Sequence, residues 1–124
     1  MSKIKILVVD DSRAMRRLIR RSLRHSGFIN IEVEEAEDGM DALEKFKTFQ
    51  PHLILSDWNM PNMNGIDLLT TLNRQYSDVN LGFITSQITQ DMRIKAEEAG
   101  SLFFLSKPFT PEKFKWTLEP YLEG

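Results

Sequence analysis

Five short runs of apolar residues recur along the chain, and longer segments with helical spacing separate them. The runs lie at about 4–9, 31–36, 53–57, 81–85 and 102–105. Short apolar runs between turn residues are typical of buried strands, whereas apolar residues three or four positions apart are typical of helices. Strands that alternate with helices predict a parallel sheet with helices on both faces. The expected fold is therefore a doubly wound α/β domain with five strands and five helices.

The helical segments carry apolar stripes and end signals. We expect helices to begin after Ser12 and Thr110, which are typical N-cap residues, and to end near Gly27 and Gly100. For the first helix we expect a buried stripe of Ala14, Leu18 and Ser22, with Met15, Ile19 and Leu23 as further candidates.

Length and composition exclude several classes of function. A chain of 124 residues is expected to form one domain over residues 1–124, with no output domain. The net charge of -2 argues against nucleic-acid binding, and the absence of cysteine excludes disulfides and thiolate zinc sites. No apolar stretch approaches the ~20 residues of a membrane span, and no signal-peptide pattern is present. We therefore expect a cytoplasmic protein.

Two of the apolar runs end in carboxylates. Asp10 and Asp11 follow the first run, and Asp57 ends the third, shortly before Pro61. The carboxyl ends of neighbouring parallel strands meet at one crevice, so we expect the three acids to converge. Close carboxylates repel one another unless a cation neutralises them, and Mg²⁺ prefers oxygen ligands. The sequence therefore predicts a magnesium site at this edge.

Two further polar side chains stand at strand ends. Thr85 ends the fourth run, and Lys107 follows the fifth. By the same crevice rule, both are expected near Asp57. A carboxylate nucleophile, a divalent cation, a hydroxyl and an ammonium are the groups needed to hold a phosphoryl group on an aspartate. The pattern therefore indicates phosphoryl transfer to Asp57.

The order of these motifs resembles that of response-regulator receiver domains over essentially the whole chain. The motifs that carry the resemblance are Asp10-Asp11, Asp57, Thr85 and Lys107-Pro108-Phe109. The stretch 57–65 is especially similar to single-domain chemotaxis regulators of that family. The resemblance implies a flavodoxin-like sheet with the strand order 2-1-3-4-5.

The resemblance also implies roles for the acids. Asp57 would accept a phosphoryl group from the phosphohistidine of a histidine kinase. Asp11, Asp57 and the main-chain carbonyl of Asn59 would bind Mg²⁺ directly, and Asp10 would act through a water molecule. The chain would then be a signalling phosphoacceptor rather than an ordinary enzyme.

By the same resemblance, Thr85 and Lys107 would contact phosphoryl oxygens, and the Lys107–Pro108 peptide bond would be cis. Thr85 and Phe104 would form the switch: Thr85 moves toward the phosphoryl group, and Phe104 fills the vacated space. The family usually carries a tyrosine or another aromatic residue at this position, and Phe104 lacks the hydroxyl with which a tyrosine would bond to a partner.

The partner surface is expected around the fourth helix, the fifth strand and the fifth helix. Ile94 and Trp116 lie opposite the core stripes of their helices, and large exposed apolar residues are enriched at binding sites. With Phe104 they would bind a protein target such as a flagellar motor switch, and the chain would be a monomer. The arginines of the first helix are expected to form a solvated basic face: Arg13, Arg16, Arg17, Arg20, Arg21 and Arg24.

Three alternative functions stay open at this point. A phosphate sink would drain a kinase without any downstream target. A phosphatase with an aspartyl-phosphate intermediate usually needs a second acid two residues after the nucleophile, where this chain has Asn59. A flavin-binding domain would need a phosphate loop after the first strand, where Asp10 and Asp11 would repel the phosphate.

Overall fold

The structure of the chain is a computed structural model that describes residues 3–122. Its strands are β1 (Ile4–Val9), β2 (Ile31–Ala36), β3 (Leu53–Ser56), β4 (Leu81–Thr85) and β5 (Phe104–Ser106). Its helices are α1 (Arg13–His25), α2 (Gly39–Phe49), α3 (Gly65–Gln75), α4 (Gln90–Glu98) and α5 (Pro111–Leu122). None of the helices in this part of the chain is both long and apolar enough to cross a membrane.

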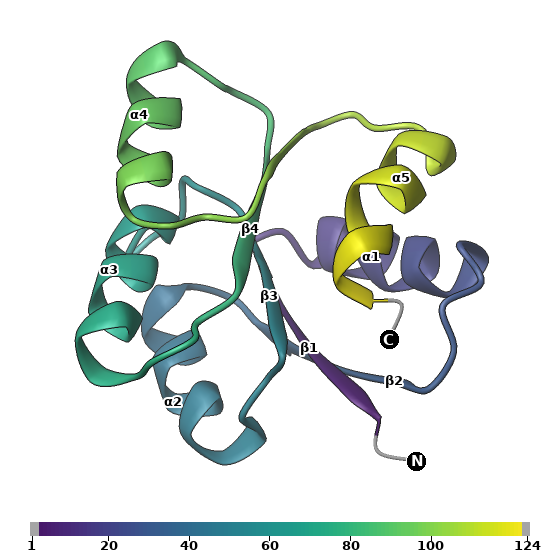
Figure 1. Ribbon diagram of the computed structural model, residues 1–124, viewed down its shortest axis with the longest axis horizontal. Helices are drawn as coiled ribbons and strands as arrows, with labels where there is room; N and C mark the ends of the chain where they lie inside the picture. Colours follow the sequence, from purple (N-terminus) through teal and green to yellow (C-terminus); the bar gives the residue numbers. More distant parts are fainter. Residues whose placement is uncertain (1–2, 123–124) are drawn as a thin grey trace.

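The strands pair in parallel to form one sheet with the order β2-β1-β3-β4-β5. Helices α1 and α5 cover one face of the sheet, and α2, α3 and α4 cover the other (Figure 1). This order and the two helical layers are those of the flavodoxin-like doubly wound fold. The predicted fold class and strand order are therefore confirmed.

Strand β1 is buried on both faces, which explains why its sequence is apolar at every inner position. Leu7 and Val9 belong to the core under α2, α3 and α4, whereas Ile6 and Val8 belong to the core under α1 and α5. None of the four has any exposed surface. A strand with helices on both sides needs apolar residues at odd and even positions alike.

The predicted helix boundaries are confirmed. The side chains of Ser12 and Thr110 each accept the backbone N–H of the residue three positions later, at 3.2 and 3.0 Å. Gly27 and Gly100 follow the ends of α1 and α4 with φ angles of 81° and 83°, in the left-handed region that glycine adopts most easily. These residues therefore mark the start of α1 and α5 and the end of α1 and α4.

The buried face of α1 differs from the first predicted stripe. Ile19 and Leu23 are buried in this helix, whereas Ala14 is exposed and Leu18 is 39% exposed. Both stripes repeat every four residues, so their spacing alone does not distinguish them. The larger branched side chains of the second stripe pack against β1 and α5, and this burial decides the orientation of the helix.

The fifth strand begins two residues later than the apolar run 102–105 had indicated. Strand β5 spans Phe104–Ser106 instead of 102–105. Leu102 and Phe103 nevertheless bond to β4, because the N–H of Leu102 donates to Leu81 and the carbonyl of Phe103 accepts from Phe83. The strand therefore ends directly before Lys107.

The ring of Phe103 lies against the backbone of β4 at Gly82. A Cβ atom added to Gly82 would lie 2.2 Å from Cζ of Phe103, far inside van der Waals contact. On its other side the ring packs against Tyr121 of α5, with ring centroids 5.5 Å apart. The glycine and the phenylalanine are therefore a matched pair.

The substitution Gly82→Ala is expected to lower the free energy of unfolding by about 1–3 kcal/mol, because the new methyl group overpacks the site. Urea unfolding measures this loss. In a Phe103→Leu background the same substitution should cost clearly less, since the atom that it meets is gone. An equal cost in both backgrounds would contradict the pairing.

Candidate functional site

Three carboxylates meet at the carboxyl edge of the sheet. Asp10 and Asp11 follow β1, and Asp57 follows the neighbouring strand β3. One carboxylate oxygen from each lies within 4.8 Å of those of the other two. Asp10 is buried, Asp57 is half-buried and Asp11 is exposed. The structure thus brings together the three acids that the strand ends predicted.

Asp10 is the most enclosed of the three. Its Oδ1 accepts the N–H of Ser12 at 2.8 Å, and its Oδ2 accepts the ammonium of Lys107 at 2.8 Å. Burial raises the pKa of Asp10 above its ordinary value, although the bonds from Lys107 and Ser12 act in the opposite direction. The ammonium of Lys107 therefore favours the charged form of Asp10, which burial disfavours.

Lys107 joins two of the acids. Its ammonium donates a second hydrogen bond to Oδ2 of Asp57 at 3.1 Å. Burial acts to lower the pKa of Lys107, but the bonds and attraction of Asp10 and Asp57 raise it above its ordinary value. The side chain is therefore an ammonium at neutral pH. Its peptide bond to Pro108 is cis, as the resemblance implied.

Asp57 is held at both oxygens. Its Oδ1 accepts the N–H of Trp58 at 2.7 Å, while Oδ2 accepts the ammonium of Lys107. Thr85 is the last residue of β4 and is 1% exposed. Strand β4 lies between β3, which precedes Asp57, and β5, which precedes Lys107. A fixed, half-exposed carboxylate that is bonded to an ammonium is suited to act as a nucleophile.

The loop after Asp57 returns close to that residue. The N–H of Gly65 donates to the carbonyl of Trp58 at 2.8 Å, and a Cβ on Gly65 would lie 2.3 Å from the carbonyl oxygen of Asp57. Only glycine allows this approach. Asn59, whose carbonyl was expected to bind the cation, is exposed on the same loop two residues beyond Asp57.

An aromatic cluster connects the site with α4. Trp58 packs against Phe83 and Phe104, with centroids 4.9 and 6.0 Å apart, and Phe83 lies 5.4 Å from Phe104. The guanidinium of Arg93 lies 5.6 Å from the centre of the Phe104 ring. The sequence predicted a role for Phe104 but missed Trp58 and Arg93. The position of Trp58 directly after Asp57 was the available signal.

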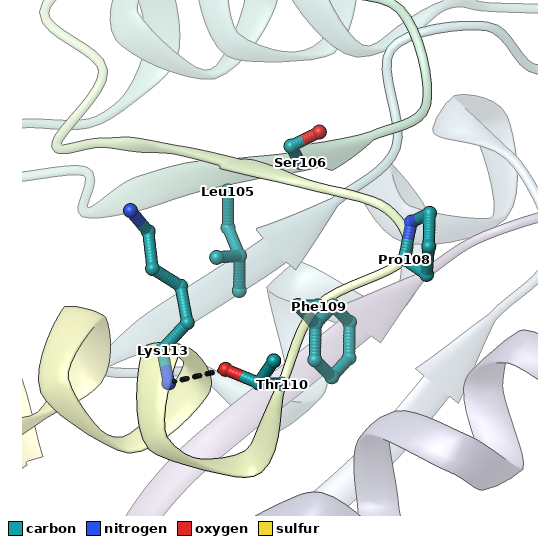
Figure 2. A pocket seen from close by; sticks show the side chains of 6 residues that line it. All are labelled: Leu105, Ser106, Pro108, Phe109, Thr110 and Lys113. Carbon is teal, nitrogen blue, oxygen red and sulfur yellow. Dashed lines mark hydrogen bonds between the residues drawn. The ribbon is translucent and has the colours of Figure 1, made fainter.

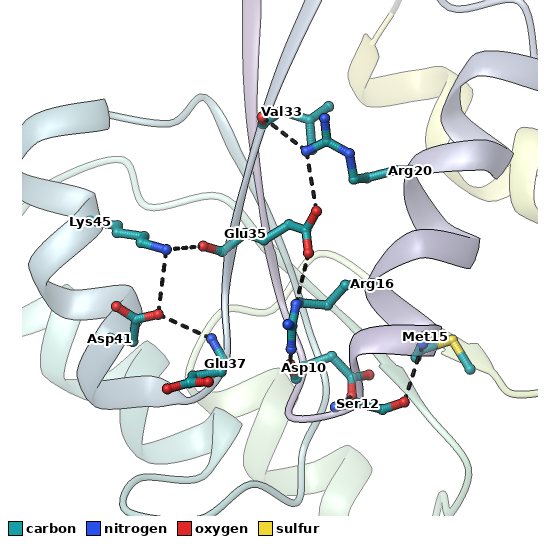
Figure 3. Close-up of polar contacts among 10 residues, drawn as sticks. All are labelled: Asp10, Ser12, Met15, Arg16, Arg20, Val33, Glu35, Glu37, Asp41 and Lys45. Atoms are coloured by element: carbon teal, nitrogen blue, oxygen red, sulfur yellow. Dashed lines mark hydrogen bonds and ion pairs between the residues drawn. The ribbon is translucent and has the colours of Figure 1, made fainter.

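Two arginines of α1 pair with Glu35 of β2, and one of them also binds the backbone of Asp10 (Figure 3). Arg16 donates to Oε1 of Glu35 at 2.8 Å and to the carbonyl of Asp10 at 2.6 Å, while Arg20 lies 3.4 Å from Oε2 of Glu35. The prediction of a solvated basic face is therefore wrong for Arg16, whose side chain is 14% exposed, whereas that of Arg20 is 39% exposed. The other four are exposed: Arg13, Arg17, Arg21 and Arg24.

The predicted partner-surface residues are exposed. Ile94 is 48% exposed on α4, and Trp116 is 71% exposed on α5, with the ammonium of Lys113 5.9 Å from its ring. These helices cover opposite faces of the sheet (Figure 1). Phe104 on β5 is only partly buried.

A pocket of about 220 Å³ lies where β5 leads into α5 (Figure 2). Six residues line it: Leu105, Ser106, Pro108, Phe109, Thr110 and Lys113. Two of these residues, Ser106 and Pro108, are the chain neighbours of Lys107. The pocket therefore lies next to the segment that carries the ammonium of the site.

Comparison with known proteins decides the family. The family model described as the response regulator receiver domain matches residues 6–119. The chain belongs to this family. The three clustered acids, Thr85 and Lys107 all lie within the residues that match the family model.

The receiver domain is similar along its length to chemotaxis regulators. It is 37% identical over 122 residues to chemotaxis protein CheY-3 of Vibrio cholerae, which covers 97% of this chain and 92% of that protein. It is also 37% identical to chemotaxis protein CheY of Pseudomonas aeruginosa, with 97% of each chain covered. The solved structure of CheY4 of Vibrio cholerae has a TM-score of 0.85, 32% identity and coverage of 98% and 100%. The chain is therefore a CheY-like response regulator of the two-component signalling type.

Receiver domains bind Mg²⁺ at an acidic pocket, and the donor set of this chain fits that ion. Asp10, Asp11 and Asp57 offer hard oxygen atoms, and the exposed Asp11 leaves the site open to solvent. Mg²⁺ prefers a few carboxylates together with water molecules. The one ammonium that bonds to the cluster within residues 3–122, that of Lys107, leaves negative charge uncompensated.

Magnesium is expected to stabilise the wild-type fold, by about 2.7 kcal/mol at a concentration about 100 times the Kd. Asp11→Asn should remove most of this effect without large loss of stability in the absence of the ion, because Asp11 is exposed. Thermal unfolding with and without Mg²⁺ measures both quantities.

The matched control is Asp78→Asn, which makes the same chemical change in an exposed residue before β4, at the other edge of the sheet. Equal stabilisation of wild type and Asp11→Asn by magnesium would contradict a cation at the cluster.

Proposed function

We propose that the chain is a phosphoacceptor: Asp57 receives a phosphoryl group from the phosphohistidine of a histidine kinase and thereby changes the binding of a downstream protein. The observation that carries this proposal is the half-buried Asp57 carboxylate, oriented by the Trp58 N–H and the Lys107 ammonium beside two further acids. The membership of the chain in the receiver family supports the same class of reaction, phosphoryl transfer to an aspartate.

In the transfer, an oxygen of Asp57 forms a bond to phosphorus while the bond from phosphorus to the imidazole nitrogen breaks. The imidazole keeps the electron pair of that bond and takes a proton from solvent. Lys107 and Thr85 contact the oxygens of the transferred group, and charge neutralisation with correct positioning is the main requirement of such a reaction. Lys107 already bonds to Asp57, so it needs to move little.

Asp11, Asp57 and the main-chain carbonyl of Asn59 would hold Mg²⁺ directly, and Asp10 would hold it through a water molecule. When bound, the ion neutralises charge on the carboxylates and on the incoming phosphoryl oxygens. Asn59 stands where aspartyl-phosphate phosphatases usually keep a second acid, and an amide cannot move a proton between substrate and water. The chain is therefore proposed to act as a signalling protein, whose only reactions form and hydrolyse its own phosphoaspartate.

Incubation with Mg²⁺ and acetyl phosphate is expected to add one phosphoryl group to the wild-type chain and none to Asp57→Asn. Intact-mass spectrometry at neutral pH detects the adduct, and hydroxylamine should remove it because it is an acyl phosphate. The control is Asp91→Asn, an exposed acid on α4 that should be phosphorylated like the wild type. An adduct that persists in Asp57→Asn would place the reaction on another residue.

The signal is proposed to leave the site through Thr85 and Phe104. Phosphorylation adds about -1.5 to -2 charges and three acceptor oxygens next to the Thr85 hydroxyl. Movement of Thr85 toward them would give the Phe104 ring a new packing position against its neighbours. A modification shifts such an equilibrium only by its differential interaction with the two arrangements. The contact between Phe104 and Arg93 extends the effect to α4.

Beryllium fluoride, a mimic of the phosphoryl group, is expected to shift the NMR signal of the Ile94 side-chain methyl in the wild type. In Thr85→Ala this shift should fall by more than half, because the hydroxyl that senses the group is absent. The control is Thr48→Ala on the exposed part of α2. An unchanged shift in Thr85→Ala would show that the signal takes another route.

The downstream partner is proposed to be a protein target such as a component of the flagellar motor switch. The chemotaxis names of the relatives from Vibrio cholerae and Pseudomonas aeruginosa support this pathway. Ile94, Phe104 and Trp116 would contact the target, and the chain would act as a cytoplasmic monomer. The alternative is a phosphate sink, and retention of a partner by the phosphorylated form distinguishes the two.

A further inference from the structure

On the proposed function, the loop between β3 and α3, residues 57–64, would supply an unusual kind of ligand. The ligand would be the main-chain carbonyl of Asn59, whose position depends on the backbone of the loop and not on a rotamer. The loop is partly closed on itself, because the N–H of Met63 donates to Pro61 at 2.7 Å and that of Gly65 donates to Trp58 at 2.8 Å. These bonds alone do not fix the loop relative to the rest of the molecule.

Two contacts join the loop to the first turn of α2. The amide nitrogen Nδ2 of Asn62 donates to Oδ2 of Asp38 at 2.7 Å, and the N–H of Gly39 donates to the carbonyl of Met63 at 3.2 Å. The packing here is tight, since a Cβ on Gly39 would lie 2.6 Å from Cγ of Met63. Asn62 itself has a φ angle of 68°, a left-handed conformation that asparagine tolerates better than most residues.

Asp38 is a buried carboxylate outside the acidic cluster, with 7% of its surface exposed. Its Oδ1 accepts the N–H of Asp41 at 2.8 Å and so caps α2, while its Oδ2 accepts from Asn62. The N–H of Asp41 and the amide of Asn62 hold the pKa of Asp38 below its ordinary value. The residue is therefore an anion at neutral pH, with each oxygen bonded to a different segment.

A helix cap alone does not explain this arrangement. An N-cap needs one oxygen acceptor, and serine, threonine or asparagine provide it about as well as aspartate. The second oxygen of Asp38 bonds 24 residues away, to a loop that carries a proposed ligand. Charge-assisted hydrogen bonds are shorter and stronger than neutral ones, which suits a contact that must hold a backbone in place.

We infer that Asp38 and Asn62 form a latch that fixes the β3–α3 loop and thereby presents the carbonyl of Asn59 to the magnesium ion. Asp38 is in this view a positioning residue, since it acts on the ion only through Asn62 and the loop backbone. The inference rests on the proposed function, because it assumes that the acidic cluster binds magnesium. Residues that orient metal ligands typically change metal affinity about ten- to a hundredfold when they are substituted.

The test exchanges the two side chains of the latch. Asn62→Asp alone would set two carboxylates against each other and is expected to weaken Mg²⁺ binding about tenfold or more. Asp38→Asn alone removes the charge but keeps a hydrogen bond, because an amide both donates and accepts and the Asn62 amide can turn to present its oxygen. This variant should therefore bind Mg²⁺ within about threefold of the wild type. The double variant, Asp38→Asn with Asn62→Asp, reverses the direction of the bond and should recover affinity to within about threefold of the wild type, because asparagine still caps the helix.

Isothermal titration of the metal-free full chain with MgCl₂ measures these affinities. The matched control is Asn30→Asp, the same chemical change in an exposed residue whose φ of 57° is also left-handed, before β2 at the other edge of the sheet. A second readout is the NMR shift of the Met60 amide, whose peptide contains the Asn59 carbonyl. That shift on magnesium addition should shrink in Asn62→Asp and return in the double variant.

The outcomes separate the latch from a simple cap. Weak binding in Asn62→Asp, recovery in the double variant and normal binding in Asn30→Asp would support it. An Asn62→Asp variant that binds magnesium like the wild type while its urea midpoint falls would overturn it, and so would a double variant that binds no better than Asn62→Asp. If the wild type binds no magnesium at all, the proposed function fails first, and the latch fails with it.

Discussion

The balance of charge at the carboxyl edge of the sheet is the constraint on which the site depends. Three carboxylates share this edge, and Lys107 bonds to two of them. Two unit charges about 4 Å apart interact by about 4 kcal/mol at the effective dielectric constant of a protein surface, so an uncompensated carboxylate is costly. A phosphoryl group on Asp57 would add further negative charge. The fold therefore places a lysine inside the cluster and leaves one open side, at Asp11, for a cation.

The rest of the molecule holds these charges in place and connects them to its surface. Arg16 binds the carbonyl of Asp10 from α1, so the backbone that carries two of the acids is tied to a neighbouring helix. On the opposite side of the sheet, Trp58 packs with Phe104 between the site and α4. Interiors are close-packed, so a displacement at Asp57 would press on the Trp58 ring directly after it, and the proposed switch uses this contact. This packing provides a physical route from the site to the exterior.

The sequence predicted the features that depend on single strands and their ends. Each strand carries its own apolar pattern, and parallel strands in one sheet end at one edge, so Asp10, Asp57, Thr85 and Lys107 could be placed together before any contact was known. The prediction for α1 was wrong for Ala14 and Leu18 but right for the further candidates Ile19 and Leu23, because two stripes of equal period were available. Choosing Ile19 over Leu18 requires knowledge of which face meets the sheet. The roles of the site residues stay predictions.

The features that could not be predicted are contacts between segments without a periodic pattern. Asp38 carries the local signal of a helix cap, and that signal accounts for one of its oxygens only. Its bond to Asn62 depends on how far the loop after β3 extends before α3 begins, which no local pattern reports. A main-chain carbonyl that binds a metal cannot be recognised from the type of residue, because every residue has a main-chain carbonyl. Whatever fixes such a ligand must therefore be sought among side chains that hold the backbone, and these become recognisable only when both segments are seen together.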